Sequence, residues 1–145
     1  MKKFRFNLQK LLNIRTFKET EAEIQLGKMI AAKDAIVLRL KTIAQQEVQT
    51  KQIFNESEKL VSDLSAYERY LARLHQKKEQ ELQALAEAEL HIEQARANYI
   101  TAHRERLIIT KLYEKKAKDW KKDMAKQQEE TLGDMINTVR QYSIP

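Results

Sequence analysis

The sequence is poor in the residues that shape compact folds. Its 145 residues include no cysteine, two glycines and one proline, which is the last residue. Because glycine and proline form most tight turns and disulfides stabilise many small folds, a compact β-rich domain is close to excluded. Charged residues make up 33% of the chain, and leucine, alanine, isoleucine and glutamine are common among the rest. This composition is typical of long exposed helices and predicts an all-α protein.

Long hydrophobic runs are also absent. No apolar run approaches the roughly 18 residues of a membrane-spanning helix, and no stretch resembles the apolar core of a signal peptide. The lack of cysteine fits a reducing compartment. We therefore expect a cytoplasmic protein whose membrane contact, if it has any, is made through a partner.

Positive charge is concentrated in two zones of this chain of net charge +6. Residues 1–18 hold basic side chains and no acid, and lysines crowd residues 111–126. Such zones attract acidic surfaces of nucleic acid, phospholipid or protein, and charge alone does not choose among them. Tyr113 and Trp120 lie in the second zone and could stack on bases. Their spacing places both in a helix–helix seam instead, which makes nucleic-acid binding the less favoured interpretation.

Apolar residues recur at alternating spacings of three and four in two stretches, from Leu8 to Phe54 and from Leu71 to Trp120. This spacing predicts two coiled-coil seams with polar interruptions. The first six residues precede the first seam position. The first series does not continue in phase into the second, and Ser65 and Glu68 between them have the spacing of a capping box, at which a helix can begin.

We therefore predict a single long antiparallel two-helix coiled-coil hairpin over residues 1–145. The helices are expected at about 7–60 and about 66–141, with the turn near residues 60–66 and the C-terminal helix overhanging the first. Folding back near residue 64 pairs Ile43 with Leu85 but places Glu47 opposite Glu81, which is a like-charged pair. The alternative is a continuous helix paired with a second chain, a homodimeric scaffold that needs no turn.

A two-helix hairpin buries one seam and leaves no interior for a pocket, whereas an enzyme needs convergent groups in a cleft that excludes water. The sequence has no Gly-rich phosphate loop. His91 follows Glu87 at a spacing that can hold a metal, but no second histidine lies nearby. We expect no catalytic residue, no cofactor, no metal and no small-molecule substrate.

The C-terminal part of the second helix should run beyond the first from about residue 127. It carries an apolar stripe at helical spacing, formed by Leu132, Met135, Ile136, Val139 and Tyr142. An apolar stripe without a partner in its own chain usually has one elsewhere. The alternative interpretation is a loosely packed tail.

The N-terminal run from Phe4 to Arg15, F-R-F-N-L-Q-K-L-L-N-I-R, is the most specific local signal. It resembles the flagellar FliJ family, whose members often begin with a similar run. The total length, the Glu/Ala-rich helix at Phe17–Gln25 and the segment Tyr67–Leu71 are similar as well. The resemblance thus covers nearly the whole chain.

The resemblance implies a non-enzymatic component of the flagellar type III export apparatus. Family members form a stalk similar to the central stalk of rotary ATP synthases, bind the hexamer of the FliI export ATPase and link it to the export gate FlhA. FliH and export chaperones are further expected partners, and the expected location is the cytoplasmic face of the inner membrane at the flagellar base. The alternative function is a basic coiled-coil nucleic-acid-binding protein or a homodimeric scaffold.

Two sets of candidate contact residues follow from the resemblance and from the apolar stripe. Tyr70 and Leu74 are candidates for the export-gate contact. The candidates for the ATPase contact are Phe4, Arg5, Phe6, Leu11, Arg15, Leu132, Met135, Ile136 and Val139.

Overall fold

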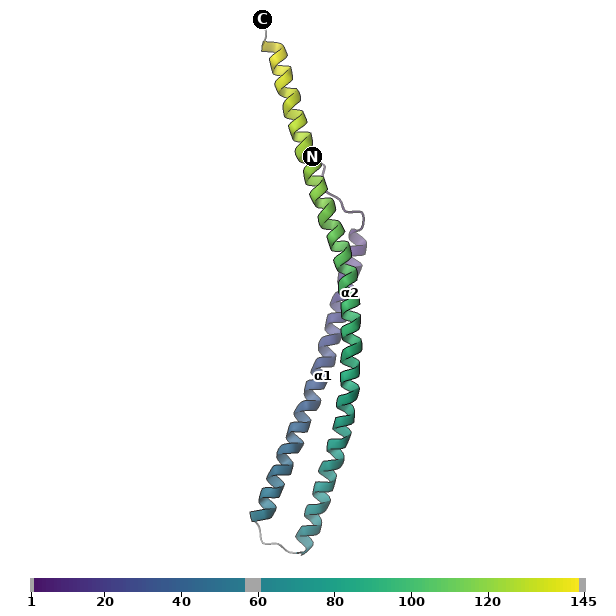
Figure 1. Ribbon diagram of the computed structural model, residues 1–145, viewed down its shortest axis with the longest axis vertical. Coiled ribbons are helices and arrows are strands. Elements are labelled where there is room, and N and C mark those ends of the chain that lie inside the picture. Colours follow the sequence, from purple (N-terminus) through teal and green to yellow (C-terminus); the bar gives the residue numbers. More distant parts are fainter. Residues whose placement is uncertain (1, 57–60, 144–145) are drawn as a thin grey trace. The chain divides into compact units, whose positions relative to one another are not determined.

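The computed structural model describes residues 2–56 and 61–143, and over these ranges the chain is all-α (Figure 1). Helix α1 spans Gln9–Glu56 and helix α2 spans Val61–Ser143. The chain forms two compact units: a terminal unit of the residues up to Glu19 with those from Ala102 onward, and a central unit of Thr20–Thr101. Both helices run through both units. Within each unit α1 and α2 pack against each other as an antiparallel hairpin, which confirms the predicted fold class.

A single apolar seam holds the two helices of the central unit together. Its buried residues are Ile36 and Ile43 on α1 and Leu74, Ala88, Ile92 and Ala95 on α2. All six occupy positions of the predicted seams. Ala88 and Ala95 are small, which lets the helices approach closely at these positions. Because helices of this length depend on tertiary packing for their stability, this narrow seam carries most of the folding energy of the unit.

The register of the hairpin differs from the predicted one. In the central unit Arg39 Nε lies 2.9 Å from Glu81 Oε1, and the rings of Phe54 and Tyr67 stack with centroids 4.0 Å apart. Each α1 residue therefore meets α2 roughly one heptad earlier in the sequence than predicted. The predicted register, including its pair of Ile43 with Leu85, is wrong.

The physical reason is the periodicity of the seam. A shift of one heptad keeps apolar positions facing apolar positions, so the apolar pattern cannot choose between the two registers. Polar residues distinguish them. The predicted register would place Glu47 opposite Glu81, whereas in the structure Glu81 accepts a hydrogen bond from Arg39. Glu47 instead accepts a hydrogen bond from Lys51 Nζ at 3.1 Å.

The predicted turn near residues 60–66 is also misplaced. Residues 61–66 belong to α2, and residues 57–60 lie outside the described residues. Ser65 does not cap a helix, since it lies inside α2, where its Oγ accepts a hydrogen bond from Arg69 Nη2 at 3.1 Å. Asp63 and Arg140 lie in the first and last turns of α2, where their charges suit the helix dipole.

In the terminal unit, α2 continues beyond its contacts with the N-terminal segment. Every residue from 125 to 143 is exposed. In Figure 1 this part of α2, coloured yellow, has no other element beside it. The predicted overhang is confirmed. Over the described ranges, neither helix is apolar enough along its length to cross a membrane.

Shortening Ile92 tests the seam. Ile92 is 6% exposed, whereas Leu90, two residues away on the same helix, is 62% exposed. We expect Ile92→Ala to lower the free energy of unfolding by about 2–4 kcal/mol, because it removes buried methyl groups and leaves a cavity. Leu90→Ala should change it by less than about 0.5 kcal/mol. Equal losses in chemical denaturation of the two variants would contradict the seam.

Candidate partner-binding surfaces

The N-terminal segment before α1 is held against α2 by aromatic rings. In the terminal unit, Phe4 and Phe6 both contact Tyr113 edge to face, with ring centroids 5.5 and 5.3 Å apart, and Phe4 also lies 6.0 Å from Trp120. Such geometry is favourable for aromatic pairs. Phe6 is buried, at 9% exposed. Packing on α2 therefore begins before Leu8, the first predicted seam position.

The spacing of the two phenylalanines explains why both reach the same helix. Phe4 and Phe6 are two residues apart, so in an extended segment their side chains point to the same side. The backbone then turns into the helix, where Gln9 N donates a hydrogen bond to Phe6 O at 3.1 Å. Arg5, between the two rings, is exposed. Phe4 and Phe6 thus hold the N-terminal segment against α2, whereas Arg5 is exposed to solvent.

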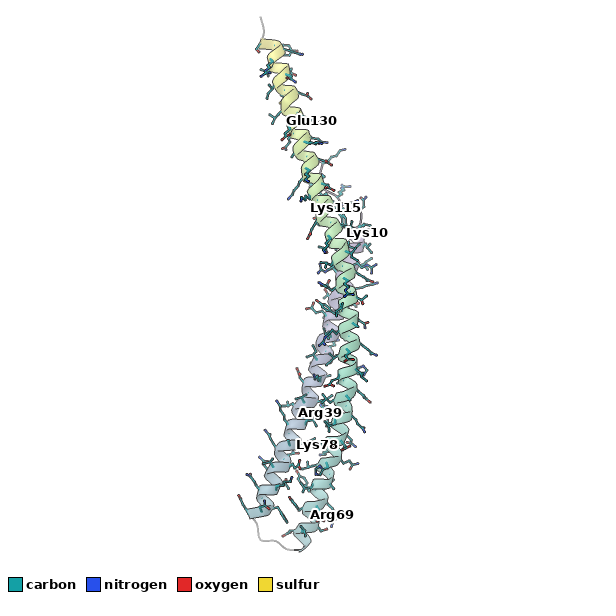
Figure 2. The ribbon with its side chains drawn as sticks, in the orientation of Figure 1. Lys10, Arg39, Arg69, Lys78, Lys115 and Glu130 are labelled. Atoms are coloured by element: carbon teal, nitrogen blue, oxygen red, sulfur yellow. The ribbon has the colours of Figure 1, made fainter. Side chains whose placement is uncertain are left out.

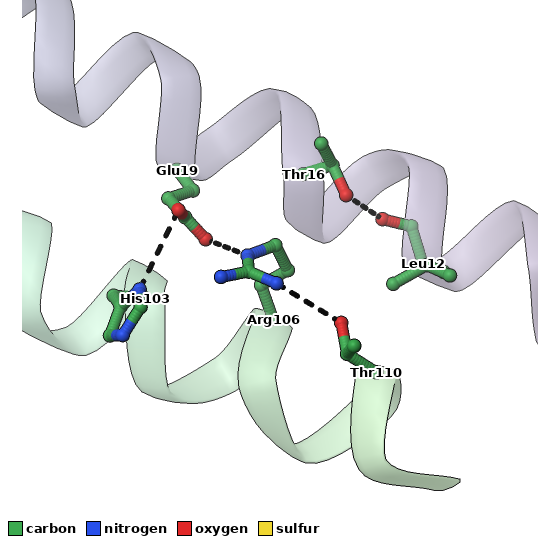
Figure 3. A network of polar contacts seen from close by, with 6 residues as sticks. All are labelled: Leu12, Thr16, Glu19, His103, Arg106 and Thr110. Carbon is green, nitrogen blue, oxygen red and sulfur yellow. Dashed lines mark hydrogen bonds and ion pairs between the residues drawn. The ribbon is translucent and has the colours of Figure 1, made fainter. Parts of the chain in front are cut away.

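A polar network interrupts the seam of the terminal unit (Figure 3). The Glu19 carboxylate accepts a hydrogen bond from Arg106 Nε and lies 3.5 Å from His103 Nδ1, while Arg106 Nη1 donates to Thr110 Oγ1 at 3.2 Å. Beside it, Arg15 pairs with the carboxylate of Glu105. Polar residues at seam positions fix the alignment of coiled-coil helices, because any other alignment leaves them without partners.

The overhang of α2 presents the predicted apolar stripe to solvent. Leu132, Met135, Ile136 and Val139 are all more than half exposed. Charged and polar residues share the same stretch of helix, including Glu130 (Figure 2). A helix that is amphipathic in this way, with no neighbour in its own unit, has the form of a docking segment for another protein.

The candidate gate residues lie in the central unit and differ in exposure. Leu74 is buried in the seam at 4% exposed, so the structure assigns it to packing. Tyr70 is half-buried, and the guanidinium of Arg73 lies 6.0 Å from its ring centroid. Ile53 and Leu64 are exposed apolar residues of the same unit. Sequence spacing gave no signal for these two, because neither occupies a seam position.

The structure therefore divides the predicted ATPase-binding residues into three groups. Arg5 and the four apolar overhang residues are exposed, and Leu11 is half-buried. Phe4, Phe6 and Arg15 have partners within the chain. Only the exposed group is available to a partner without rearrangement of the terminal unit.

Glu47 of the central unit lies beside basic side chains. The hydrogen bond and positive charge of Lys51 lower the pKa of Glu47, and His75 Nε2 lies 3.9 Å from the same carboxylate.

Within residues 2–56 and 61–143, no group of three or more histidine, aspartate or glutamate side chains is arranged to hold a metal ion.

These features define the class of protein as an antiparallel coiled-coil hairpin with exposed apolar and basic surfaces. The family model described as Flagellar FliJ protein matches residues 4–137. The chain belongs to the FliJ family, a non-enzymatic component of the flagellar protein export apparatus. The match includes Leu132, Met135 and Ile136 and ends before Val139. Neither the curated proteins nor the solved structures contain a match to the chain.

Replacing Phe6 tests the aromatic contacts. We expect Phe6→Ala to lower the free energy of unfolding by about 2–4 kcal/mol, because it removes a buried ring and its contact with Tyr113. Arg5→Ala, at the exposed neighbouring position, should be neutral within about 0.5 kcal/mol. Thermal and urea melts followed by circular dichroism would measure both. A neutral Phe6→Ala variant would show that the N-terminal segment does not pack on α2.

Proposed function

We propose that this protein is the coupling stalk of the flagellar export ATPase, with its terminal unit bound in the ring of a FliI-type hexamer and its central unit in contact with the FlhA export gate. Membership of the FliJ family supports this assignment. The single observation that carries it is the exposed apolar stripe on the overhang of α2, which is typical of a surface that binds another protein.

The terminal unit has the surface chemistry of a ring-binding element. Its overhang has exposed apolar side chains. The lysines of residues 111–126, on the part of α2 that precedes the overhang, are exposed as well. Apolar contact supplies affinity, whereas peripheral positive charge accelerates association with an acidic partner and makes the rate depend on salt. Arg5, in the N-terminal segment of the same unit, adds to this positive charge.

Coupling in this proposal requires no chemistry by the chain itself. A stalk that binds ring subunits with different affinities in their different nucleotide states shifts the populations of those states. The two helices present different side chains around the terminal unit, so the ring subunits would meet different surfaces. Stimulation of ATP hydrolysis follows if the favoured state is the one that limits turnover.

Of the two candidates for the gate contact, Tyr70 is retained, because Leu74 is buried in the seam. FliH and export chaperones are proposed as further partners, at the cytoplasmic face of the membrane near the flagellar base. The competing proposal, nucleic-acid binding by the lysine zone, is weakened because Tyr113 packs on Phe4 and Phe6 and is not free to stack on bases.

Charge on the overhang tests ring binding. The double variant Leu132→Glu with Ile136→Glu should lose most of the stimulation of ATP hydrolysis by a purified FliI-type ATPase, because carboxylates cannot be buried against an apolar partner surface. Asn137→Glu, on the opposite face of the same helix, should retain it. Full stimulation by the double variant at saturating concentration would remove the overhang as the coupling element.

Truncating Tyr70 tests the gate contact separately. We expect Tyr70→Ala to weaken binding to purified FlhA cytoplasmic domain by about tenfold, the effect of losing an interface aromatic, while leaving ATPase stimulation intact. Leu90→Ala, which removes an exposed apolar side chain elsewhere in the central unit, is the control. Titration calorimetry gives both affinities. Unchanged affinity of the Tyr70 variant would exclude this residue from the contact.

A further inference from the structure

A second apolar face lies on α1 of the central unit, on the side opposite the seam. Five exposed residues, from Ile24 to Leu38, recur along this side of the helix at spacings of three, four, four and three. We infer that this face binds a second copy of the same chain, packed antiparallel against it. The face, called the outer stripe, consists of Ile24, Gly27, Ala31, Ala35 and Leu38.

Gly27 is the first indication of an external partner. A glycine inside a helix costs about 1 kcal/mol relative to alanine. Its φ is not positive, and a Cβ placed on Gly27 would meet no atom within 4 Å, so the fold of the chain has no need of a glycine here. A missing side chain on an exposed helix face instead permits the close approach of another backbone. Gly27, Ala31 and Ala35 form a smooth strip that is suited to a second helix.

Large apolar residues mark the two ends of the strip. Ile24 is 52% exposed and Leu38 is 65% exposed. The spacing of the outer stripe is the same in both directions from Ala31. A two-fold axis at Ala31 therefore places Ile24 against Leu38 of the second copy, and Gly27 against Ala35 of the second copy. Such self-complementarity is the requirement for a symmetric dimer interface.

Charges on the edges of the stripe select the antiparallel orientation. Near the ends of the stripe, one edge carries Glu21 and Arg39 and the other carries Glu23 and Lys41, while Lys28 and Asp34 lie on the two edges closer to Ala31. In an antiparallel pair Glu21 meets Arg39 of the second copy, and Glu23 meets Lys41. In a parallel pair the two glutamates would face each other, as would the two cations. Flanking charges of this kind set the orientation of paired helices.

These edge charges are available for contacts outside the chain. None of Glu21, Glu23 and Lys41 forms an ion pair with any other residue that the structure describes. Arg39 forms an ion pair with Glu81 through Nε, and its side chain remains about half exposed. The outer stripe is about 20 Å long. A contact of this length buries less surface than a stable dimer interface, which buries more than about 1,000 Å². The association is therefore weak and reversible.

Sedimentation velocity of the full chain between about 10 and 500 µM, a range that brackets weak association, tests this inference. The wild-type chain should shift from monomer to dimer as concentration rises. Gly27→Leu should raise the dissociation constant at least about tenfold, because its side chain blocks close approach, while its Cβ meets nothing within the chain. Val48→Glu, an exposed α1 position away from the stripe, should leave it unchanged.

Charge exchange tests the orientation. Glu23→Lys and Lys41→Glu should each weaken association, and an equal mixture of the two variants should restore it, because the exchanged charges then face each other. A parallel dimer would instead be strengthened by Glu23→Lys, which brings a cation next to Glu21. A wild-type chain that stays monomeric over the whole range overturns the inference, as does a dimer unaffected by Gly27→Leu. Circular dichroism of each variant confirms that the helices are intact.

Discussion

The narrow apolar seam between α1 and α2 is the interaction on which every other feature depends. Neither unit has a second layer of structure to bury a helix face, so each helix persists because one stripe of its surface is covered by the other helix. The rest of each helix remains in contact with solvent. A chain organised in this way has most of its surface free for partners, which suits a protein that works by binding.

The seam also explains which candidate residues are available to partners. Leu74 and Phe6 are large and apolar, as interface residues often are, but the chain uses both for its own packing. The overhang of α2 is different, because no α1 residue lies beside it and its apolar stripe stays exposed. In the terminal unit the Glu19–Arg106 pair holds the helices in one alignment. The surfaces proposed to bind partners are therefore presented by a defined scaffold.

The heptad pattern was sufficient to predict the fold class, the buried positions of the two helices and the overhang. It could not predict the register, because a shift of one heptad still aligns seam positions with seam positions, and polar pairs such as Arg39 with Glu81 reveal the difference. The S-x-x-E spacing at Ser65 was misleading because it also occurs inside helices. The packing of Phe6 was missed since it precedes the periodic region. The outer stripe was missed because small residues on an exposed face produce no hydrophobic periodicity.

The central claim is that the seam forms within one chain. Because the sequence contains no cysteine, spin labels can be attached to Gln46→Cys and Lys77→Cys, whose wild-type residues line the same groove between α1 and α2. Double electron–electron resonance should give a short distance, consistent with an interaxial separation of about 8–10 Å, and dilution with unlabelled chain should not change it. Loss of the short distance on dilution would show that the helices pair between chains, and would contradict the hairpin.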